Sequence, residues 1–308
     1  MSTNQKRYRK GTSDGGKFAP DANAESTVIL DDNVQPTATK SDRVMAELSA
    51  GVRGLTESGK WQAYLDTQSK FHSYSFGNAV LIGIQNPDAT RVAGFNKWKE
   101  LGRQVRKGEH GASILAPIIR TKKDESGDKD KDHKYVAGFT TATVFDVRQT
   151  DGEPLPEIAP LLTGVAPEGQ FQSLTEVAGG FGFSVERREL TGGVNGYCSP
   201  SEKLIVVESR NDEVQQVKTL AHELGHALLH EEGNDLPRDH KEIEAESVAY
   251  VVSQALGINS GDYSFGYLTS WGHGDPEAVE KQLKSSGQRI QKASHQIIEQ
   301  FGKVPVNV

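Results

Sequence analysis

Residues 217–230 have the sequence VKTLAHELGHALLH, and this stretch decides the fold of the second half of the chain. Its large apolar residues recur three or four positions apart, the spacing at which side chains share one face of an α-helix. They are Val217, Leu220, Leu224 and Leu228. Asn211 or Asp212 is suited to cap the start of such a helix, and Gly233 is suited to end it. The sequence therefore predicts a long amphipathic helix between these residues.

Three polar residues of this helix have the spacing of a metal site. His222 and His226 are four positions apart, which puts their Cβ atoms ~5–6 Å apart on one face, so both imidazoles can reach one zinc ion. Glu223 is turned by about 100° from His222, beside the metal as a base for water rather than as a ligand. This is the His-Glu-x-x-His pattern of zinc peptidases. Because the helix is strongly amphipathic, we prefer this interpretation to two solvated surface histidines.

A catalytic zinc ion needs a third protein ligand and an open position for water. The candidates are Glu242, Glu244 and Glu246, in a second predicted helix at about residues 240–256. Glu242 and Glu246 share a face with small residues that allow close helix contact, so Glu242 is the predicted ligand. Glu246, one turn later, is placed to orient a ligand imidazole by a hydrogen bond. Glu244 or Glu246 as the ligand remain alternatives, and a carboxylate that is not used is expected to be solvated.

Residues around the motif have simpler expected roles. His230 is ~12 Å along the helix from His222, too far to share its ion, and is expected to interact with the helix terminus. Cys198 is expected to be a small buried or strand-edge residue. A strand predicted at residues 203–208 is a candidate edge for pairing with an extended substrate. An oxyanion-stabilising side chain is also expected, and the candidates are Tyr250, Tyr263 and Tyr267.

The composition argues against disulfides and membrane spans. The 308-residue chain has 35% hydrophobic and 25% charged residues and a formal net charge of -7, so its surface is not positive throughout. A single cysteine excludes an intrachain disulfide and a four-cysteine zinc site. No apolar run approaches the ~20 residues of a membrane helix, and the polar N-terminus lacks a signal-peptide core. We therefore expect a cytoplasmic protein with no membrane partner.

Changes in composition divide the chain into four parts. Residues 1–40 are rich in small polar residues and are expected to be disordered. Residues 41–150 combine helical spacing with two β-like runs, which predicts helices and a two-stranded ribbon. Residues 151–168 contain four prolines and are expected to form a linker. Residues 169–303 hold the metal motif and a closing amphipathic helix. The predicted fold class is α+β, with two domains.

The first predicted domain contains a basic segment within an acidic protein. Between residues 91 and 107 the only acid is Glu100, whereas the basic residues are Arg91, Lys97, Lys99, Arg103, Arg106 and Lys107. Phe95 and Trp98 lie among them. Cations that bind phosphates and aromatic rings that stack on bases are what single-stranded nucleic-acid binding requires. The alternative is that the rings are core residues and the charges a solvated face.

Two parts of the chain resemble known families. A resemblance to the N-terminal domain of ArdC-type antirestriction proteins is carried by WQAYL (61–65), FHSYSFGN (71–78), QNPDATRVAGF (85–95), LGRQVRKGE (101–109) and VFDVRQT (144–150). The 222–226 motif, together with residues 242–252, is similar to ImmA/IrrE-like and SprT-like metallopeptidase domains. In such domains the third ligand belongs to a Glu-x-x-Ala pattern, which Glu242 and Ala245 match. Glu246 stands where those relatives often have Asn or Asp.

The resemblance implies a function for each half of the chain. It implies an N-terminal domain that binds single-stranded DNA, a zinc peptidase-like C-terminal domain, and protection of plasmid, phage or other mobile DNA against restriction. Together with the motif, it predicts a zinc metalloendopeptidase with one zinc ion per chain, acting on a protein substrate that the sequence does not name. Two alternatives remain: a non-catalytic DNA-coating protein with structural zinc, and a regulatory protease that cleaves a repressor.

Overall fold

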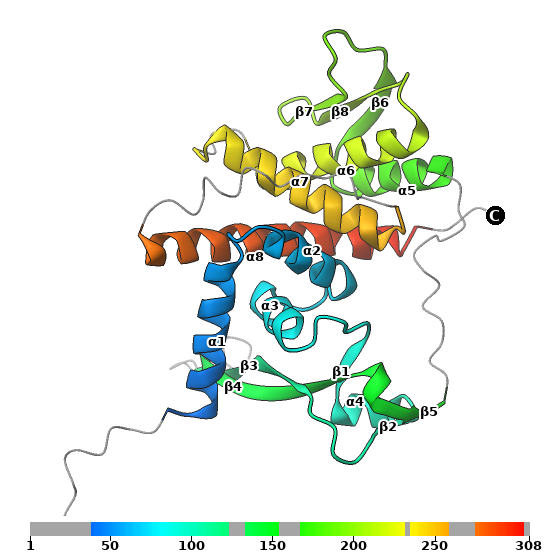
Figure 1. Cartoon of the computed structure of the whole chain (residues 1–308). Coiled ribbons are helices and arrows are strands. Elements are labelled where there is room, and N and C mark those ends of the chain that lie inside the picture. The colour runs from blue at the N-terminus through cyan, green and yellow to red at the C-terminus, as the bar shows by residue number, and fades with distance from the viewer. Residues whose placement is uncertain (1–37, 123–132, 154–166, 232–234, 259–274, 305–308) are drawn as a thin grey trace, which may run out of the picture. The chain divides into compact units, whose positions relative to one another are not determined.

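The structure is a computed structural model that describes residues 38–122, 133–153, 167–231, 235–258 and 275–304 (Figure 1). The predicted disorder of residues 1–40 lies outside these ranges except for the last three residues, as do most of the predicted linker and both Tyr263 and Tyr267. Helices and small sheets both occur, which confirms the α+β class. Within the described part, no helix has the length and apolar character needed to cross a membrane.

The first part of the described chain combines helices with a long ribbon. The helices are α1 (Lys40–Gly54), α2 (Lys60–Lys70), α3 (Phe76–Gln85), α4 (Phe95–Glu100) and the 3-10 helix η2 (Val147–Gln149). The strands are β1 (Val92–Gly94), β2 (Arg103–Val105), β3 (Ala112–Lys122), β4 (His133–Asp146) and β5 (Thr150–Gly152). β3 pairs antiparallel with β4, whose other edge pairs with β1, and β2 pairs with β5. The predicted ribbon is therefore confirmed.

Two amide side chains of α3 attach this helix to the outer edge of β3. Asn78 exchanges two hydrogen bonds with the backbone of Leu115, at 2.9 and 3.0 Å. Gln85 makes the same pair of bonds with Ser113, at 2.9 and 2.8 Å. Because each amide satisfies one N–H and one C=O of the strand, this part of the edge is closed to pairing with another strand.

The second part of the described chain places helices beside a three-stranded sheet. Its elements are α5 (Pro167–Gly180), β6 (Ser184–Arg188), β7 (Gly196–Ser199), β8 (Leu204–Glu208), α6 (Glu213–Leu229), α7 (Arg238–Ala255) and α8 (Pro276–Phe301). Asp212 is the N-cap of α6, where its side chain accepts a hydrogen bond from Gln215 N, as the sequence predicted. The strand order is β6-β8-β7. The prediction that residues 203–208 form the edge strand is wrong, because β8 is paired on both sides; β7 is an edge strand.

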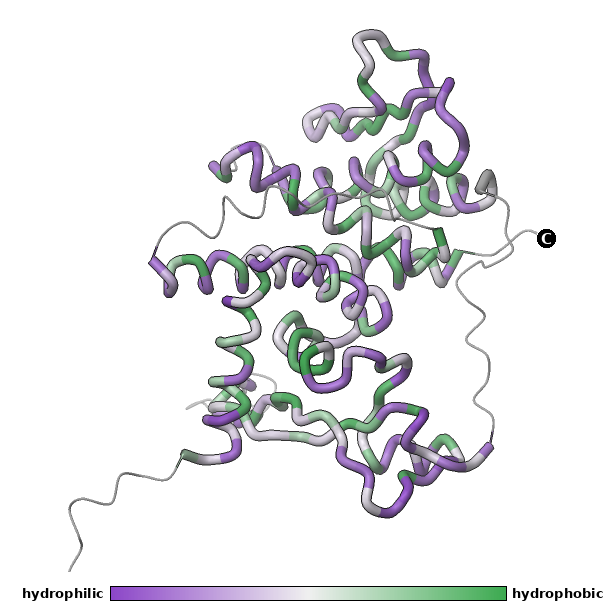
Figure 2. The backbone as a smooth tube through the Cα atoms, viewed as in Figure 1, coloured by the Kyte–Doolittle hydropathy of each residue, from purple (hydrophilic) through white to green (hydrophobic). Residues whose placement is uncertain are grey.

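Helices from both parts of the chain bury side chains in one hydrophobic cluster. The cluster includes Trp61 of α2 and Phe76 of α3 together with Leu224 of α6 and Ile290 of α8. Trp61 Nε1 also donates to Ser247 Oγ on α7, at 3.0 Å. Figure 2 shows the apolar character of α3, which lies against this core. Residues 39–308 accordingly form one compact unit, within which the predicted boundaries at 41–150 and 169–303 stay a prediction.

Candidate metal centre

Three side chains from α6 and α7 bring ligand atoms to one point. His222 Nε2 and His226 Nε2 are 3.1 Å apart. Glu242 Oε2 lies 3.6 Å from each of them. Two nitrogen ligands at ~2.0–2.1 Å from one tetrahedral zinc ion are themselves ~3.3–3.4 Å apart, so the three atoms are close to the positions of a ligand set. Among the described residues, this is the group of His, Cys, Asp or Glu side chains able to hold a metal ion.

Close contact between α6 and α7 makes this convergence possible. Gly225 of α6 faces Ala245 of α7, and a Cβ atom at Gly225 would lie 3.0 Å from Ala245 Cα and 3.2 Å from Ala245 O. The two helix backbones therefore touch where a side chain on either helix would separate them. Because Ala245 lies between Glu242 and Glu246, both carboxylates reach the histidines of α6. The small residues of α7 had indicated this approach.

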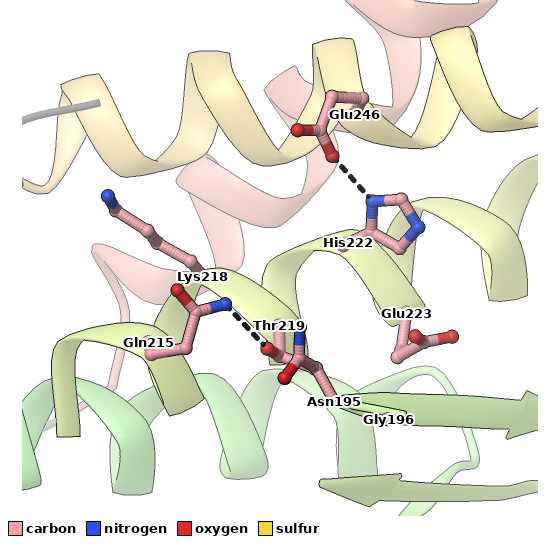
Figure 3. Close-up of a pocket in the computed structure, with 8 residues that line it drawn as sticks. All are labelled: Asn195, Gly196, Gln215, Lys218, Thr219, His222, Glu223 and Glu246. Carbon is pink, nitrogen blue, oxygen red and sulfur yellow. Dashed lines mark hydrogen bonds and ion pairs between the residues drawn. The ribbon is translucent and has the colours of Figure 1, made fainter. Parts of the chain in front are cut away.

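The orientation of the His222 ring is set by Glu246. His222 Nδ1 lies 2.9 Å from Glu246 Oε2 (Figure 3), while its Nε2 lies 3.6 Å from Glu242 Oε2. The carboxylate accepts only, so Nδ1 keeps its proton, and a bound metal would replace the proton on Nε2. This is the contact expected for Glu246. Burial opposes the charged imidazole, but the adjacent carboxylates of Glu242 and Glu246 outweigh it and raise the pKa of His222 to about 10.

The electrostatics of the other two candidate ligands also favour a bound cation. A hydrogen bond with His222 lowers the pKa of Glu242 to about 2, so this carboxylate is charged at neutral pH. Burial, reinforced by the positive charge of His222, lowers the pKa of His226 to about 4. His226 is therefore neutral at pH 7 and Glu242 is negative, and a divalent ion bound here would take the place of the proton on His222.

Glu223 lies next to this point but faces β7. Its side chain is only 7% exposed, and the backbone N–H of Cys198 donates to it. Burial, which outweighs the opposite effect of His222, raises the pKa of Glu223 to about 7. A carboxyl group with that pKa can both take and return a proton near neutral pH. Cys198 is half-buried, as expected, and burial raises the pKa of its thiol to about 11.

A pocket opens between Gly196 of β7 and His222 of α6 (Figure 3). Its volume is about 310 Å³, and Asn195, Gly196, Lys218, His222 and Glu223 are among the residues that line it. A Cβ atom at Gly196 would lie 2.6 Å from Thr219 Cγ2 and 2.8 Å from Val206 O, so only glycine allows β7 this close to α6. The pocket therefore has the edge strand β7 on one side and the candidate ligand His222, with Glu223 and Glu246, on the other.

Three further residues extend the site away from the pocket, and the sequence interpretation missed their contacts. His230 Nδ1 lies 2.9 Å from His226 Nδ1, and His230 Nε2 lies 3.3 Å from Glu244 Oε2. Glu244 in turn pairs with Arg289 of α8. The expectation that an unused Glu244 is solvated is wrong, because its side chain is fully buried. His230 was detectable as the next residue on the face of His222 and His226, whereas nothing near the motif indicated Arg289.

Tyr250 is not placed to stabilise an oxyanion. Its ring is 2% exposed, and its hydroxyl donates to Asp66 Oδ1 of α2 at 2.6 Å. Gln62 Nε2 donates to the same hydroxyl, at 3.3 Å. This candidate is therefore corrected: Tyr250 attaches α7 to α2 rather than facing the pocket.

The aromatic component of the basic segment is also corrected. Trp98 is only 2% exposed and its Nε1 donates to Phe145 O at 2.9 Å, so its ring is part of the core and is closed to stacking on a base. Phe95, in contrast, is 50% exposed at the start of α4. The ring that a base could reach in this segment is therefore that of Phe95, whereas the sequence had favoured Trp98.

The cations of the basic segment differ in their contacts. Arg103 donates to Thr150 Oγ1 and O, and Arg106 donates to the carboxylates of Glu109 and Asp151, so both hold β5 and its neighbours. Of the remaining cations, Arg91 is half-buried, and Lys97 forms an ion pair with Glu100 at 3.1 Å. Lys99 and Lys107 are exposed. The two last-named lysines keep their charge at the surface.

Comparisons with known proteins agree with the resemblance inferred from the sequence. Residues 35–145 match the model of the N-terminal domain of anti-restriction factor ArdC, and residues 182–256 match the IrrE N-terminal-like domain, a metallopeptidase-like domain. An uncharacterised protein of Bacillus anthracis is 25% identical in an alignment of 255 positions that covers 69% of this chain and 43% of that protein. The chain thus spans less than half the length of this curated relative.

One of two solved structures of an ArdC protein has a TM-score above 0.5 with this chain. The Mn(II)-bound crystal structure of antirestriction protein ArdC from plasmid R388 has a TM-score of 0.52 and 21% identity, covering 84% of this chain and 98% of that chain. Its metal-free structure has a TM-score of 0.49 and 23% identity, covering 75% and 86%. The Mn(II)-bound structure supports the α+β fold, and the two matched segments confirm the combination of an ArdC-type with an IrrE-like domain.

Proposed function

We propose that this protein is an antirestriction protein in which a DNA-binding ArdC-type domain is joined to a divalent-metal-dependent peptidase. The observation that carries the peptidase half is the convergence of His222, His226 and Glu242 beside a buried carboxyl group, Glu223, at the mouth of a pocket. The antirestriction half rests on the match of residues 35–145.

The proposed ligand set is His222, His226 and Glu242, one ion per chain. Two imidazoles and one carboxylate leave a fourth position open, the arrangement of a catalytic zinc site, so zinc is the metal that we propose. The related ArdC structure was solved with Mn(II), and imidazole and carboxylate groups also accept that ion. Zinc and manganese are therefore compared directly in the experiments below.

In this proposal, the residues of the chain bind the substrate and move the proton. A bound divalent ion would polarise the scissile carbonyl and activate a water molecule. Glu223, whose buried carboxyl group lies beside this position, would accept the proton of that water and pass it to the leaving amine. Among the described strands β7 pairs only with β8, so the part of its other edge that the Cys198–Glu223 hydrogen bond leaves open is available for hydrogen bonds with an extended peptide.

The proposed DNA contact uses the exposed part of the basic segment. Lys99 and Lys107 supply charge for phosphates, and Phe95 supplies an exposed ring for an unstacked base. We propose single-stranded DNA as the ligand because neither contact recognises base edges or requires a duplex groove. Arg91 and Lys97 flank the same segment, whereas Arg103 and Arg106 act by holding its backbone in place.

One pair of assays separates catalysis from DNA coating. Wild type and Glu223→Gln are compared for cleavage of casein, with and without single-stranded DNA, and for protection of transferred DNA in a restricting host. The proposal predicts that the variant binds metal and DNA like wild type but loses cleavage and protection. Full protection by the variant would support a non-catalytic DNA-coating protein instead. Cleavage of a repressor by wild type, without any effect on restriction, would support a regulatory protease.

A further inference from the structure

We infer that His230, Glu244 and Arg289 form a positioning chain that fixes the imidazole of His226 for metal binding and connects α8 to the metal centre. The inference rests on the proposed metal site and adds three residues to it. None of the three is a proposed ligand. They act through His226, so we call them positioning residues.

The contacts run without a gap from the site to α8. His226 Nδ1 is 2.9 Å from His230 Nδ1, and the two ring centroids are 5.0 Å apart. His230 Nε2 is 3.3 Å from Glu244 Oε2. The other oxygen of Glu244 pairs with Nη2 of Arg289, whose Nε lies 3.2 Å from Oε2. His230 is the C-cap of α6, Glu244 belongs to α7 and Arg289 to α8.

Because His226 is a proposed metal ligand, the direction of each hydrogen bond from His226 through His230 to Glu244 is fixed. His226 presents Nε2 toward His222 and Glu242, so its lone pair is on Nε2 and its proton on Nδ1. That N–H must donate, and His230 Nδ1 is therefore the acceptor. His230 then carries its proton on Nε2 and donates it to Glu244. A carboxylate at the far end thus determines the tautomer of His226 through one intervening imidazole.

The burial of His230 and Glu244 and the charge of Arg289 indicate that these residues hold one another in place. The side chains of His230 and Glu244 are 4% and 0% exposed, and an isolated charge in such a position is costly. Arg289, 34% exposed, supplies the compensating charge and also donates to Ser285 and Ser286 of α8. The carboxylate is thereby held rigidly, and a rigid acceptor holds the ring that bonds to it.

The two candidate histidine ligands are therefore oriented in different ways from the same helix. Glu246 bonds His222 directly, at 2.9 Å. Glu244 lies on a different side of α7 and reaches His226 through His230. The acids at 242, 244 and 246 thus have three separate roles: ligand, remote orienting group and direct orienting group. Glu244, which the sequence interpretation kept only as an alternative ligand, is the most deeply buried of the three.

The test compares metal affinity and metal geometry in the full-length protein. Zinc affinity is measured by competition with a chromogenic chelator, and the visible absorption of bound Co(II) reports ligand geometry. His230→Leu removes both hydrogen bonds and is expected to weaken zinc binding by about 10- to 100-fold and to change the Co(II) spectrum. His230→Gln, which retains one acceptor and one donor, is expected to restore most of the affinity. Arg289→Gln is expected to weaken binding in the same direction, on the order of tenfold, because it leaves Glu244 uncompensated.

A matched control lies on the same helix as Arg289. His295 of α8 also lies 3.0 Å from another histidine, His72, and forms an ion pair with Glu299, and neither partner belongs to the site. His295→Leu is expected to leave zinc affinity unchanged. The positioning chain is refuted if both His230→Leu and Arg289→Gln bind zinc like wild type. If zinc affinity depends on His230 but wild type cleaves no peptide, the positioning chain is supported and the proposed peptidase function fails. If wild type binds no divalent ion, both the positioning chain and the proposed peptidase function fail.

Discussion

Replacement of Gly225 by alanine is expected to damage the metal centre from a position that touches no ligand atom. The new Cβ would lie 3.0 Å from Ala245 Cα, 3.2 Å from Ala245 O and 3.3 Å from Val248 Cβ. Backbone atoms of α7 cannot rotate aside as the end of a flexible side chain can. The whole segment that carries Glu242 must therefore move away from α6 by a few tenths of an ångström.

The net effect on stability is the difference between two opposing terms. Alanine is favoured over glycine inside a helix by ~1 kcal/mol. Overpacking of a tight contact costs ~1–3 kcal/mol. We expect Gly225→Ala to be destabilised by about 0–2 kcal/mol in the metal-free protein. Because Glu242 and Glu246 move with α7, we also expect zinc affinity to fall by about tenfold.

Gly179 provides a matched control for the gain in helix propensity when glycine is replaced by alanine. It lies in α5, and nothing would be within 4 Å of a Cβ atom there. Gly179→Ala is expected to stabilise the protein by up to ~1 kcal/mol, with unchanged zinc affinity. Urea denaturation of the metal-free proteins and chelator competition measure the two quantities. If Gly225→Ala and Gly179→Ala have the same stability and the same zinc affinity, the close contact of α6 and α7 does not hold Glu242 in place.

Three further outcomes are expected. Glu223→Gln should reduce the kcat of peptide cleavage by about 10²- to 10⁴-fold while the bound metal, measured by mass spectrometry, stays at the wild-type level; an unchanged kcat would remove Glu223 from the mechanism. Lys99→Gln combined with Lys107→Gln should weaken single-stranded DNA binding in fluorescence anisotropy and make it less salt-dependent, by a slope of ~0.7 for each phosphate that the protein no longer neutralises. Hydrogen bonds from Arg210 lower the pKa of Glu208 from 4.5 to about 2, so its stabilising effect is complete above pH 4.5 and is lost as the pH falls toward 2. Glu208→Gln should therefore lower the Tm at pH 7 but not near pH 2, and an equal loss at both pH values would contradict this ionic role.

The sequence predicted the parts of the site that depend on helical periodicity. His222 and His226 had to share a face, because four residues are close to one turn. The small residues beside Glu242 indicated which helix would approach them. The position of the α6 N-cap also followed from local chemistry, since Asp212 accepts a hydrogen bond three residues ahead.

Features that depend on the tertiary arrangement could not be obtained in this way. The sequence around Trp98 is equally compatible with an exposed ring and with a buried ring that donates to Phe145 O. Only the tertiary fold determines which of the two occurs. Strand order has no local signal either, so residues 204–208 gave no sign of lying between two other strands. Glu244 required knowledge of α8, which supplies Arg289 from a position 45 residues further along the chain.

The central claim is that His222, His226 and Glu242 hold one divalent ion, and calorimetric titration of zinc into the metal-free protein tests it most directly. Wild type is expected to bind one ion per chain, and Glu242→Ala is expected to bind at least tenfold more weakly, because the third ligand is lost while Glu246 still orients His222. Manganese titrated in parallel shows which ion the site prefers. Wild-type affinity in Glu242→Ala, or no binding of either ion to wild type, would contradict the claim.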